Sequence, residues 1–372
     1  MRTLTIAHID SELSWRGGQK QVIELIRGLS QRGQRNLLIC RRGSKIAEKA
    51  ETEGIDVTYI PLRGEWDVIS AWKLRKIIKK RGIDIIHTHN SHAHTIALFA
   101  LAGIPKCKLV VSRRVDFHIQ NPLSRVFKYS SRVDKIIAVS DAIKRILVED
   151  GIDPGLITTI RSGFVFDQFI NSDKSHDIRH EMGIPADTIV ITTVASLAPH
   201  KAHMDLLKSA SLVVKKHPNV RFLLAGEGTL REQIEKQINN LELEPYVMLL
   251  GFIDDIGSLY RASDIFALTS EEEGLCTSIL DAMYFHLPIV ATSAGGIPEI
   301  VHDQSNGFIV PVHDYMAFAD RLNLLIEQPE RRKTMGERSG DILPQYSITH
   351  TVEQTLALYR TLTGLIQSSD ST

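Results

Sequence analysis

The feature that most constrains this chain is a regular alternation of short apolar runs with longer amphipathic stretches. In the first half, runs rich in Val, Ile and Leu predict strands at residues 4–9, 36–40, 57–60, 83–87, 108–112 and 135–139. Stretches with helical spacing lie between some of them, at residues 19–31, 69–81 and 141–150. This alternation is typical of βαβ units, so it predicts a parallel sheet covered by helices.

The alternation restarts after a polar stretch at residues 171–181. New strands are predicted at 189–194, 220–225, 247–250, 265–268, 288–291 and 307–310, with helices at 204–216, 230–241, 278–285 and 316–327. The sequence therefore predicts an α/β fold with two doubly wound domains, 1–168 and 169–345, joined by a hinge near 164–175. A last helix, about 350–366 within the segment 346–372, either finishes the second domain or packs back on the first.

Composition excludes several classes of protein. With 43% hydrophobic residues the chain is an ordinary globular protein, and its longest weakly polar run, 95–104, is far shorter than the ~20 residues of a membrane-spanning helix. Charge comes too early at the N-terminus for a signal peptide. Cys40, Cys107 and Cys276 form no CxxC pair, which fits a reduced cytosol and argues against a cysteine metal site. We therefore expect a cytoplasmic protein.

Charge is unevenly distributed along the chain. Residues 1–170 hold 28 Lys and Arg against 17 Asp and Glu, a net +11, and residues 171–372 hold 16 against 27, a net −11. The basic half suggests a surface that faces phosphates or lipid, unless the asymmetry is chance. Residues 72–81 read as a basic amphipathic helix, for which we expect peripheral contact with an anionic membrane through Trp72, Ile77 and Ile78. Alternatively, Leu74, Ile77 and Ile78 pack on the sheet and the lysines are solvated.

Residues just after the predicted strands are the candidates for binding, because open α/β sheets bind ligands at the carboxyl ends of their strands. Gly17 and Gly18 precede a helix and either bring backbone amides to a phosphate or form a plain tight turn. Lys201, with Ser196 in the same loop, follows strand 189–194. It is placed to neutralise a pyrophosphate, unless it is an ordinary solvated lysine. The Gly295-Gly296 turn offers further amides.

The segment SEEEGLCTSILDAM is the most informative stretch of the chain. Glu273 and Asp281 are eight residues apart, at most ~12 Å along a helix axis. That separation is too large for two carboxylates that act as acid and base on a single bond, but it suits two carboxylates that bind the two ends of a hydroxyl-rich ligand. Glu271 and Glu272 fit a solvated acidic surface.

These pieces occur in a characteristic order along nearly the whole chain. They are GG at 17–18, IIAVS at 136–140, VASLAPHK at 194–201, GEG at 226–228, LLGFIDD at 249–255, EGLCTSILDAM at 273–283 and AGGIPEIV at 294–301. The set resembles the retaining glycosyltransferases of family 4, also called glycosyl transferases group 1, with the GT-B fold. The resemblance implies two Rossmann-like domains facing a central cleft, and a nucleotide-diphosphate sugar held mainly by the second domain.

The resemblance also implies roles for individual residues. Lys201 and Glu273 would be the catalytic pair, with Lys201 on the diphosphate and Glu273 on hydroxyls of the transferred sugar. Asp281 would take the ribose. The other residues implied in donor binding are Gly17, Gly18, Ser196, Gly274, Leu275, Cys276 and Thr277.

The chain departs from the family pattern at four places. The second acid of the family's E-x7-E is Asp281, Ser196 stands where the family often has Arg, and Cys276 stands where glycine is usual. The family's histidine near the donor sugar has no clear counterpart, so Arg114, Asp116 and His118 are candidates for that role.

Metal binding is considered at two motifs. HTHNSHAH places four imidazoles within eight residues, which either bind a transition metal or, as we expect of His89, line the site and contact the acceptor or donor sugar. No DxD triplet occurs. We therefore expect no cofactor and no metal, with Lys201 and aligned amides stabilising the leaving diphosphate.

The expected function is transfer of a sugar from a nucleotide-diphosphate sugar to a hydroxyl of a glycan or lipid-linked acceptor. The expected setting is lipopolysaccharide or other cell-surface polysaccharide biosynthesis. Two alternatives stay open: a nucleotide-sugar epimerase or hydrolase on the same fold, and a non-catalytic sugar-binding subunit. Neither half contains GxGxxG, which argues against a nicotinamide dehydrogenase. We expect no nucleic-acid partner.

Overall fold

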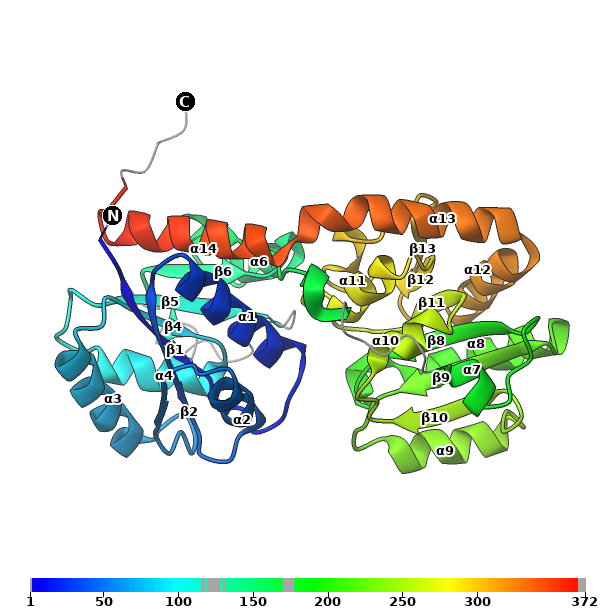
Figure 1. Cartoon of the computed structure of the whole chain (residues 1–372), viewed down its shortest axis with the longest axis horizontal. Coiled ribbons are helices and arrows are strands. Elements are labelled where there is room, and N and C mark those ends of the chain that lie inside the picture. The colour runs from blue at the N-terminus through cyan, green and yellow to red at the C-terminus, as the bar shows by residue number, and fades with distance from the viewer. Residues whose placement is uncertain (1, 115–117, 119–127, 130–131, 170–176, 367–372) are drawn as a thin grey trace. The chain divides into compact units, whose positions relative to one another are not determined.

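The computed structural model describes residues 2–114, 118, 128–129, 132–169 and 177–366 (Figure 1). The chain divides into two compact units. Unit 1 comprises residues 1–163 and 348–372, and unit 2 comprises residues 164–347. The sequence places these boundaries at 168/169 and 345/346.

Unit 1 is built on a parallel sheet of seven strands in the order β3-β2-β1-β4-β5-β6-β7. The strands are β1 (Thr5–Ile9), β2 (Arg35–Cys40), β3 (Val57–Tyr59), β4 (Ile85–Thr88), β5 (Lys108–Arg113), β6 (Lys135–Ala138) and β7 (Ile157–Thr159). Six of them match predicted strands. The edge strand β7 was not predicted, because three residues with a single buried isoleucine give too short an apolar signal.

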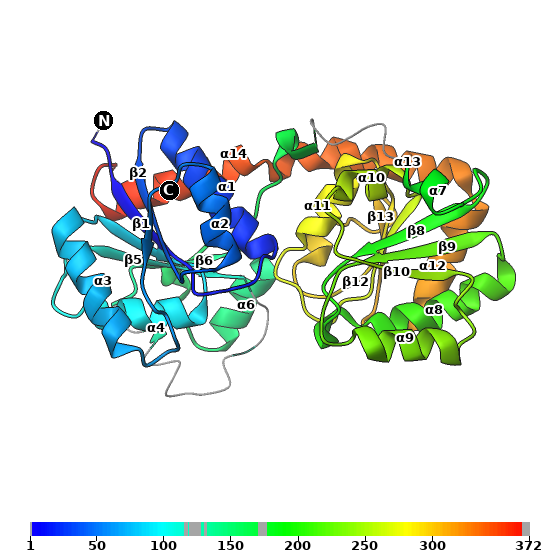
Figure 2. The same cartoon turned by 60° about the horizontal axis from the view of Figure 1, so that its bottom comes forward.

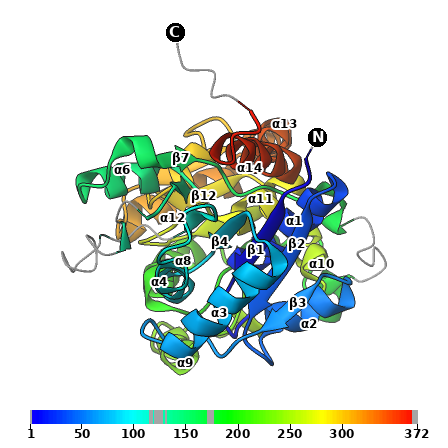
Figure 3. The ribbon, with the colours of Figure 1, turned by 90° about the vertical axis from the view of Figure 1, so that its left-hand side faces the viewer.

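Helices cover both faces of this sheet. They are α1 (Gly17–Gln31), α2 (Lys45–Thr52), α3 (Val68–Arg81), α4 (Ser91–Ala100), α6 (Asp141–Glu149) and α14 (Ile348–Leu362), with a 3₁₀ turn at Pro154–Leu156. Leu25 of α1 and Val352 and Tyr359 of α14 share one apolar core with the sheet. Figures 1 and 3 show α14 on one face and α3 and α4 on the other. The last helix of the chain thus belongs to unit 1.

Unit 2 repeats the design with six parallel strands in the order β10-β9-β8-β11-β12-β13. The strands are β8 (Ile189–Val194), β9 (Val220–Ala225), β10 (Val247–Gly251), β11 (Ile265–Leu268), β12 (Ile289–Thr292) and β13 (Gly307–Val310). All six lie where the apolar runs predict them. They are found readily because parallel strands are buried on both faces and read as continuous apolar runs.

The helices of unit 2 are α7 (Ile178–Glu181), α8 (His203–Lys216), α9 (Arg231–Asn240), α10 (Ile256–Arg261), α11 (Thr277–Tyr284), α12 (Tyr315–Glu327) and α13 (Pro329–Ile342). Short 3₁₀ turns lie at Phe166–Phe169, Pro199–Lys201, Ile297–Glu299 and Leu343–Tyr346. Figure 2 shows α8 and α9 together on one face of the sheet. The predicted α/β fold with two doubly wound sheets is confirmed.

Each sheet has one point where the strand order reverses. In unit 1 it lies between β1 and β4, and in unit 2 between β8 and β11. At such a point the connections after the two strands diverge to opposite faces and leave a crevice at the carboxyl ends, where ligands bind. The loops after these four strands are therefore the expected location of ligand-binding side chains.

Candidate functional site

The switch point of unit 2 brings together the two residues predicted to be catalytic. Lys201 lies in the loop after β8, and Glu273 lies in the loop after β11. Lys201 Nζ donates to Glu273 Oε1 at 2.5 Å, and Ser270 Oγ donates to the same oxygen at 2.9 Å. Both side chains are largely buried, 15% and 9% exposed. The result is a shielded ion pair at the carboxyl end of the sheet, although 72 residues separate its members in sequence.

Backbone contacts between the two loops fix this ion pair. Thr269 Oγ1 donates to the carbonyl oxygens of Lys201 and Ala202, at 3.2 and 3.1 Å. The amide of Glu271 donates to the carbonyl of His200 at 2.8 Å. Ala202 has a φ of 47°, a left-handed conformation that ends the 3₁₀ turn and starts α8. Lys201 is thereby held on a constrained turn and not on a free loop.

The GEG turn at 226–228 supports the loop that leads to Lys201. A Cβ on Gly226 would lie 1.9 Å from the carbonyl oxygen of Ala195, and one on Gly228 would lie 2.3 Å from that of Leu197. The amide of Leu197 in turn donates to the carbonyl of Glu227 at 3.0 Å. These glycines permit close packing of two loops, so the motif has a structural task here. Ser196 lies between the two packed residues.

The segment after Glu273 leads into α11. Gly274, Leu275 and Cys276 are buried, and Thr277 is the first residue of the helix, whose first amides have no partner within it. Cys276 Sγ lies 3.2 Å from Ser278 Oγ. Burial, together with the charge of Glu273, raises the pKa of the Cys276 thiol to about 12, so this cysteine is a neutral wall of the site.

Asp281 lies one turn further along α11. Its Oδ1 accepts a hydrogen bond from Gln168 Nε2 at 2.8 Å. Gln168 belongs to the 3₁₀ turn Phe166–Phe169 at the start of unit 2. The predicted ribose ligand is therefore already oriented by an amide, a partner that the sequence pattern did not indicate.

Next to the switch point of unit 1, Arg114 follows β5 and places a partly buried cation beside the glycine turn. Gly17 and Gly18 open α1, and a Cβ on Gly18 would lie 3.6 Å from Arg114 Cδ. Arg114 Nη1 donates to Ser162 Oγ at 3.3 Å, while its buried Nε has no hydrogen-bond partner among the described residues. Burial lowers the pKa of this guanidinium to about 10, against the opposing effect of Asp10. Of the two described candidates for the family's histidine role, Arg114 and His118, Arg114 is the one beside the glycine turn.

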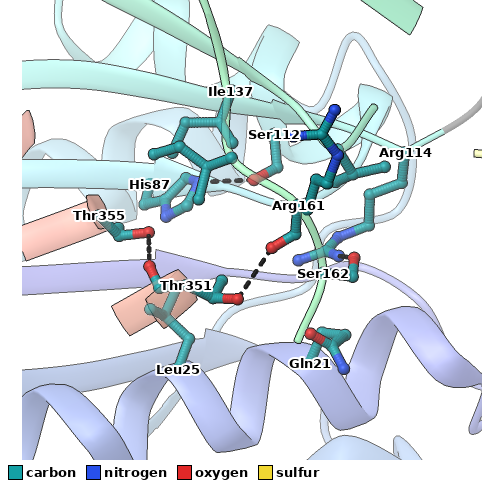
Figure 4. Close-up of a pocket in the computed structure, with 12 residues that line it drawn as sticks. Gln21, Leu25, His87, Ser112, Arg114, Ile137, Arg161, Ser162, Thr351 and Thr355 are labelled. Atoms are coloured by element: carbon teal, nitrogen blue, oxygen red, sulfur yellow. Dashed lines mark hydrogen bonds between the residues drawn. The ribbon is translucent and has the colours of Figure 1, made fainter. Parts of the chain in front are cut away.

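A small cavity lies beside Arg114 in unit 1 (Figure 4). In Figure 4 the side chains of Ser112, Arg114, Ser162 and His87 border it, and His87 bonds Ser112. Thr351 and Thr355 of α14 close another side. The C-terminal helix thus contributes walls to a cavity whose other walls come from α1, from β4, β5 and β6, and from the segment after β7.

His89 belongs to a cluster of three buried histidines with His8 and His87. His8 Nδ1 and His89 Nε2 are 3.1 Å apart, and His8 Nε2 lies 3.3 Å from Asn36 Oδ1. His87 Nε2 bonds Ser112 Oγ at 2.7 Å. Burial lowers the pKa of His8 to about 4 and lowers the pKa of His87 and His89 as well.

The sequence motif did not indicate His8 or the partner of the other His87 nitrogen. His87 Nδ1 lies 2.6 Å from the Tyr359 hydroxyl of α14. Hydrogen bonds therefore engage five of the six ring nitrogens of the cluster, leaving His89 Nδ1, which has no partner among the described residues. A hydrogen-bonded network accounts for the cluster without a metal, so we propose no metal site there.

The remaining candidates lie apart from this cluster or outside the described residues. His118 is exposed, and its Nδ1 pairs with Asp150 Oδ1 at 2.8 Å, a contact that raises the histidine pKa. Asp116 falls outside the described residues. His118 therefore does not share the buried environment of His89.

Both halves of the chain match models of known families. Residues 15–167 match the model described as Glycosyltransferase Family 4, and residues 174–340 match the model described as Glycosyl transferases group 1. The chain belongs to the family 4 glycosyltransferases. This confirms the family that the ordered motifs indicate.

Named relatives share moderate identity with this glycosyltransferase. It is 30% identical over 182 residues to a putative glycosyltransferase, EpsD, of Bacillus subtilis, a match covering 49% of this chain and 48% of that relative. It is 26% identical over 270 residues to the UDP-Gal:alpha-D-GlcNAc-diphosphoundecaprenol alpha-1,3-galactosyltransferase of Escherichia coli, covering 69% and 70%. The chain thus spans about half of the length of the first relative and more of the second.

Solved structures share the fold. HepE of Anabaena, solved in complex with UDP-glucose, superposes with a TM-score of 0.82 at 22% sequence identity, covering 95% of this chain and 100% of that chain. Within the described residues, no helix combines the length and apolar character needed to cross a membrane.

Proposed function

We propose that this glycosyltransferase moves a sugar from a nucleotide-diphosphate sugar to a hydroxyl of a glycan or lipid-linked acceptor, with retention of anomeric configuration. The proposed setting is lipopolysaccharide or other cell-surface polysaccharide biosynthesis, in the cytoplasm. The observation that carries the proposal is the Lys201–Glu273 pair at the switch point of unit 2. It combines a cation for a diphosphate with an anion for sugar hydroxyls at one place.

Lys201 is suited to the step in which charge develops. When the bond between the anomeric carbon and the diphosphate oxygen breaks, negative charge grows on the diphosphate, and a positioned ammonium stabilises that charge. A lysine has three N–H donors, so Lys201 can donate to Glu273 and to a diphosphate oxygen at once. The turn that fixes Lys201 keeps this donor in place without reorganisation during the reaction.

Glu273 is suited to the sugar end of the donor. An ionised carboxylate accepts hydrogen bonds at two oxygens, and Lys201 and Ser270 both donate to Oε1. Hydroxyls of the transferred sugar are donors of the kind that this acidic group binds. Asp281, oriented by Gln168, is proposed for the ribose. In this proposal the acceptor hydroxyl attacks on the face that the diphosphate leaves, and no metal ion takes part.

The relative with a diphosphoundecaprenol acceptor in its name supports a lipid-linked acceptor, and the UDP-glucose complex of HepE supports a nucleotide-sugar donor. The two alternatives differ in what they require: an epimerase or hydrolase would turn over the donor without an acceptor, and a sugar-binding subunit would bind without turnover.

A two-stage experiment tests the proposal. Thermal-shift screening against a panel of UDP-, GDP- and ADP-sugars is expected to raise the melting temperature with one donor family, because ligands that bind the folded state stabilise it. The stabilising donor is then incubated with glycan and undecaprenyl-linked acceptors, with EDTA present, and the anomeric configuration of the product is read by NMR. Acceptor-dependent transfer with retention is expected. Donor breakdown or isomerisation without acceptor would favour the epimerase or hydrolase, and binding without turnover would favour the subunit.

A further inference from the structure

The outer face of α3 in unit 1 exposes a group of large apolar side chains. Trp66, just before the helix, is 74% exposed, and Val68, Ile69 and Trp72 are 72%, 63% and 54% exposed. Exposed apolar side chains usually occur singly on soluble proteins, and a contiguous group marks a surface that contacts something. Figures 1 and 3 show α3 at the periphery of unit 1, beside α4.

Helix geometry puts these apolar residues and the lysines of α3 on the same side. At 3.6 residues per turn, the exposed residues of α3 other than its last residue, Arg81, fall within a sector of about 140°: Val68, Ile69, Trp72, Lys73, Lys76, Lys79 and Lys80. The buried residues Ser70, Leu74 and Ile78 lie on the opposite side, against unit 1. Leu74 and Ile78 therefore pack inward, and the apolar part of the outer face comes from residues before Lys73, not from Ile77 and Ile78.

The charge of this face is of one sign. The helix VISAWKLRKIIKKR contains no acidic residue. The two acids that precede it are engaged elsewhere: Glu65 pairs with Lys128, and Asp67 accepts from the Ser70 amide at 2.9 Å as the helix cap. Lys76 Nζ lies 3.5 Å from the centre of the Trp72 ring. The face therefore has an apolar end and a basic end, with no acid on the helix to neutralise the lysines.

We propose that this α3 face, formed by Trp66, Val68, Ile69, Trp72 and the four lysines, docks unit 1 on an anionic lipid surface. Lysine is depleted at protein interfaces, whereas tryptophan beside lysine is typical of helices that lie in the headgroup region of a bilayer. The tryptophans and aliphatic side chains enter the headgroup boundary, and the lysines meet anionic headgroups. The inference rests on the proposed function only in that a lipid-linked acceptor would lie in such a surface.

The test uses the full chain and vesicles alone, without donor or acceptor, so its failure is distinguishable from failure of the proposed function. Binding is measured by flotation and by tryptophan fluorescence with phosphatidylcholine vesicles. It is repeated with vesicles in which about a third of the lipid is phosphatidylglycerol, a content that gives the surface a negative potential. We expect binding to the anionic vesicles that weakens with salt, with a blue shift of the tryptophan emission.

Two sets of variants separate this face from general electrostatics. Lys73→Gln/Lys76→Gln/Lys80→Gln is expected to weaken binding about a hundredfold, at about fivefold per charge. The matched control, Lys215→Gln/Lys236→Gln/Lys333→Gln, removes the same charge from exposed positions of unit 2 and should leave binding near that of the wild type. Trp66→Ser/Trp72→Ser should weaken binding by roughly tenfold or more, since these side chains lose apolar contact, while Met316→Ser, 60% exposed in unit 2, should not.

Three results would overturn the inference. One is no binding to anionic vesicles, and a second is equal loss of binding in both lysine triples. The third is concentration-dependent dimerisation that Trp66→Ser/Trp72→Ser abolishes while vesicle binding persists, which would make the face a contact between copies of this chain. Circular dichroism of each variant checks that the fold is retained.

Discussion

The two units share one architecture but handle polar groups at their switch points in opposite ways. Unit 2 places complementary charges there, the Lys201–Glu273 pair, tied down by side chains and backbone from two loops. Unit 1 places neutral imidazoles there, His8, His87 and His89, hydrogen-bonded to one another and to Ser112 and Tyr359. The same strand order therefore creates a crevice twice, and the side chains at the carboxyl ends of the strands decide what each crevice can do.

This difference has a physical consequence. Buried imidazoles are stable only while they are neutral, because burial disfavours their charged form. A buried ion pair stays charged, since each member compensates the other, and it can offer charge to a ligand. We infer that unit 2 provides the charges used in transfer, and that the histidine network of unit 1 shapes a polar wall around Arg114.

The sharpest contrast between the units is expected in their sensitivity to acid. Burial lowers the pKa of four histidines of unit 1: to about 4 for His8, to about 3 for His94, and also for His87 and His89. Among the described residues of unit 2, only His203 has a comparably lowered pKa, at about 4. In the unfolded chain these histidines have a pKa of about 6.5. Above that pH they are neutral in both the folded and the unfolded state, so they do not lower the free energy of unfolding. As the pH falls from 6.5 towards 4, the unfolded chain binds protons first, and stability is lost.

At pH 5.5, one unit below 6.5, each such histidine lowers the free energy of unfolding by roughly 1.4 kcal/mol. With four such histidines against one, unit 1 should lose about 4 kcal/mol more of its free energy of unfolding than unit 2. Hydrogen exchange followed by mass spectrometry, corrected for intrinsic rates and compared between β1/β4 and β8/β11 peptides at pH 7 and 5.5, measures this. His94→Gln should reduce the loss in unit 1 by the share of one histidine, and His203→Gln should affect unit 2 alone. Equal loss in both units would contradict the contrast.

The next largest effect is expected at Lys201. Lys201→Ala should lower turnover roughly 10²–10³-fold, as with other single electrostatic donors, because the diphosphate loses its fixed cation. Steady-state kinetics with the stabilising donor measures it. Lys208→Ala removes a half-exposed lysine that pairs with Asp205 within the same helix, α8; it is the control and should change little. Turnover close to that of the wild type in Lys201→Ala would remove the assignment.

Glu273→Gln should have a smaller effect, and it should affect sugar transfer more than nucleotide binding. Replacing the charged acceptor by an amide is expected to reduce kcat/KM for transfer roughly 10- to 100-fold while nucleoside diphosphate affinity changes far less. Titration calorimetry with the nucleoside diphosphate measures the affinity, and steady-state kinetics with the donor measures kcat/KM. Glu272→Gln, an exposed neighbour, serves as the control. An equal loss of both quantities would indicate a structural role for Glu273.

The smallest effect is expected at Asp281. Asp281→Asn keeps the shape of the side chain, so nucleotide affinity should fall only about fivefold, the increment of a charged over a neutral hydrogen bond. Calorimetry with the nucleoside diphosphate, beside Asp320→Asn on the exposed surface of unit 2, is the measurement. Unchanged affinity would remove Asp281 from the ribose assignment.

The sequence predicts the sheets well because parallel strands are buried on both faces and read as apolar runs. It also predicts that Lys201 and Glu273 lie just after strands, where the structure places them. It does not predict that His8 joins His87 and His89, because this depends on β1 lying beside β4 in the sheet, with His8 and His87 in register.

Other features depend on packing that a linear pattern does not contain. Tyr359 reaches His87 because the chain returns to unit 1 as α14, and Gln168 reaches Asp281 from the start of unit 2. For Leu74 and Ile78 the structure agrees with the second of the two alternatives, packing against unit 1, and the sequence left this open because periodicity does not tell which side of a helix meets the sheet. The structure places Trp66, Val68 and Ile69 outside.

We propose that unit 2 binds the donor through Lys201 and Glu273. A crystal structure with the stabilising nucleotide sugar tests it most directly. We expect diphosphate oxygens within about 3 Å of Lys201 Nζ, sugar hydroxyls on Glu273 and the ribose beside Asp281. A nucleotide bound at any place away from residues 201 and 273–281 would contradict it.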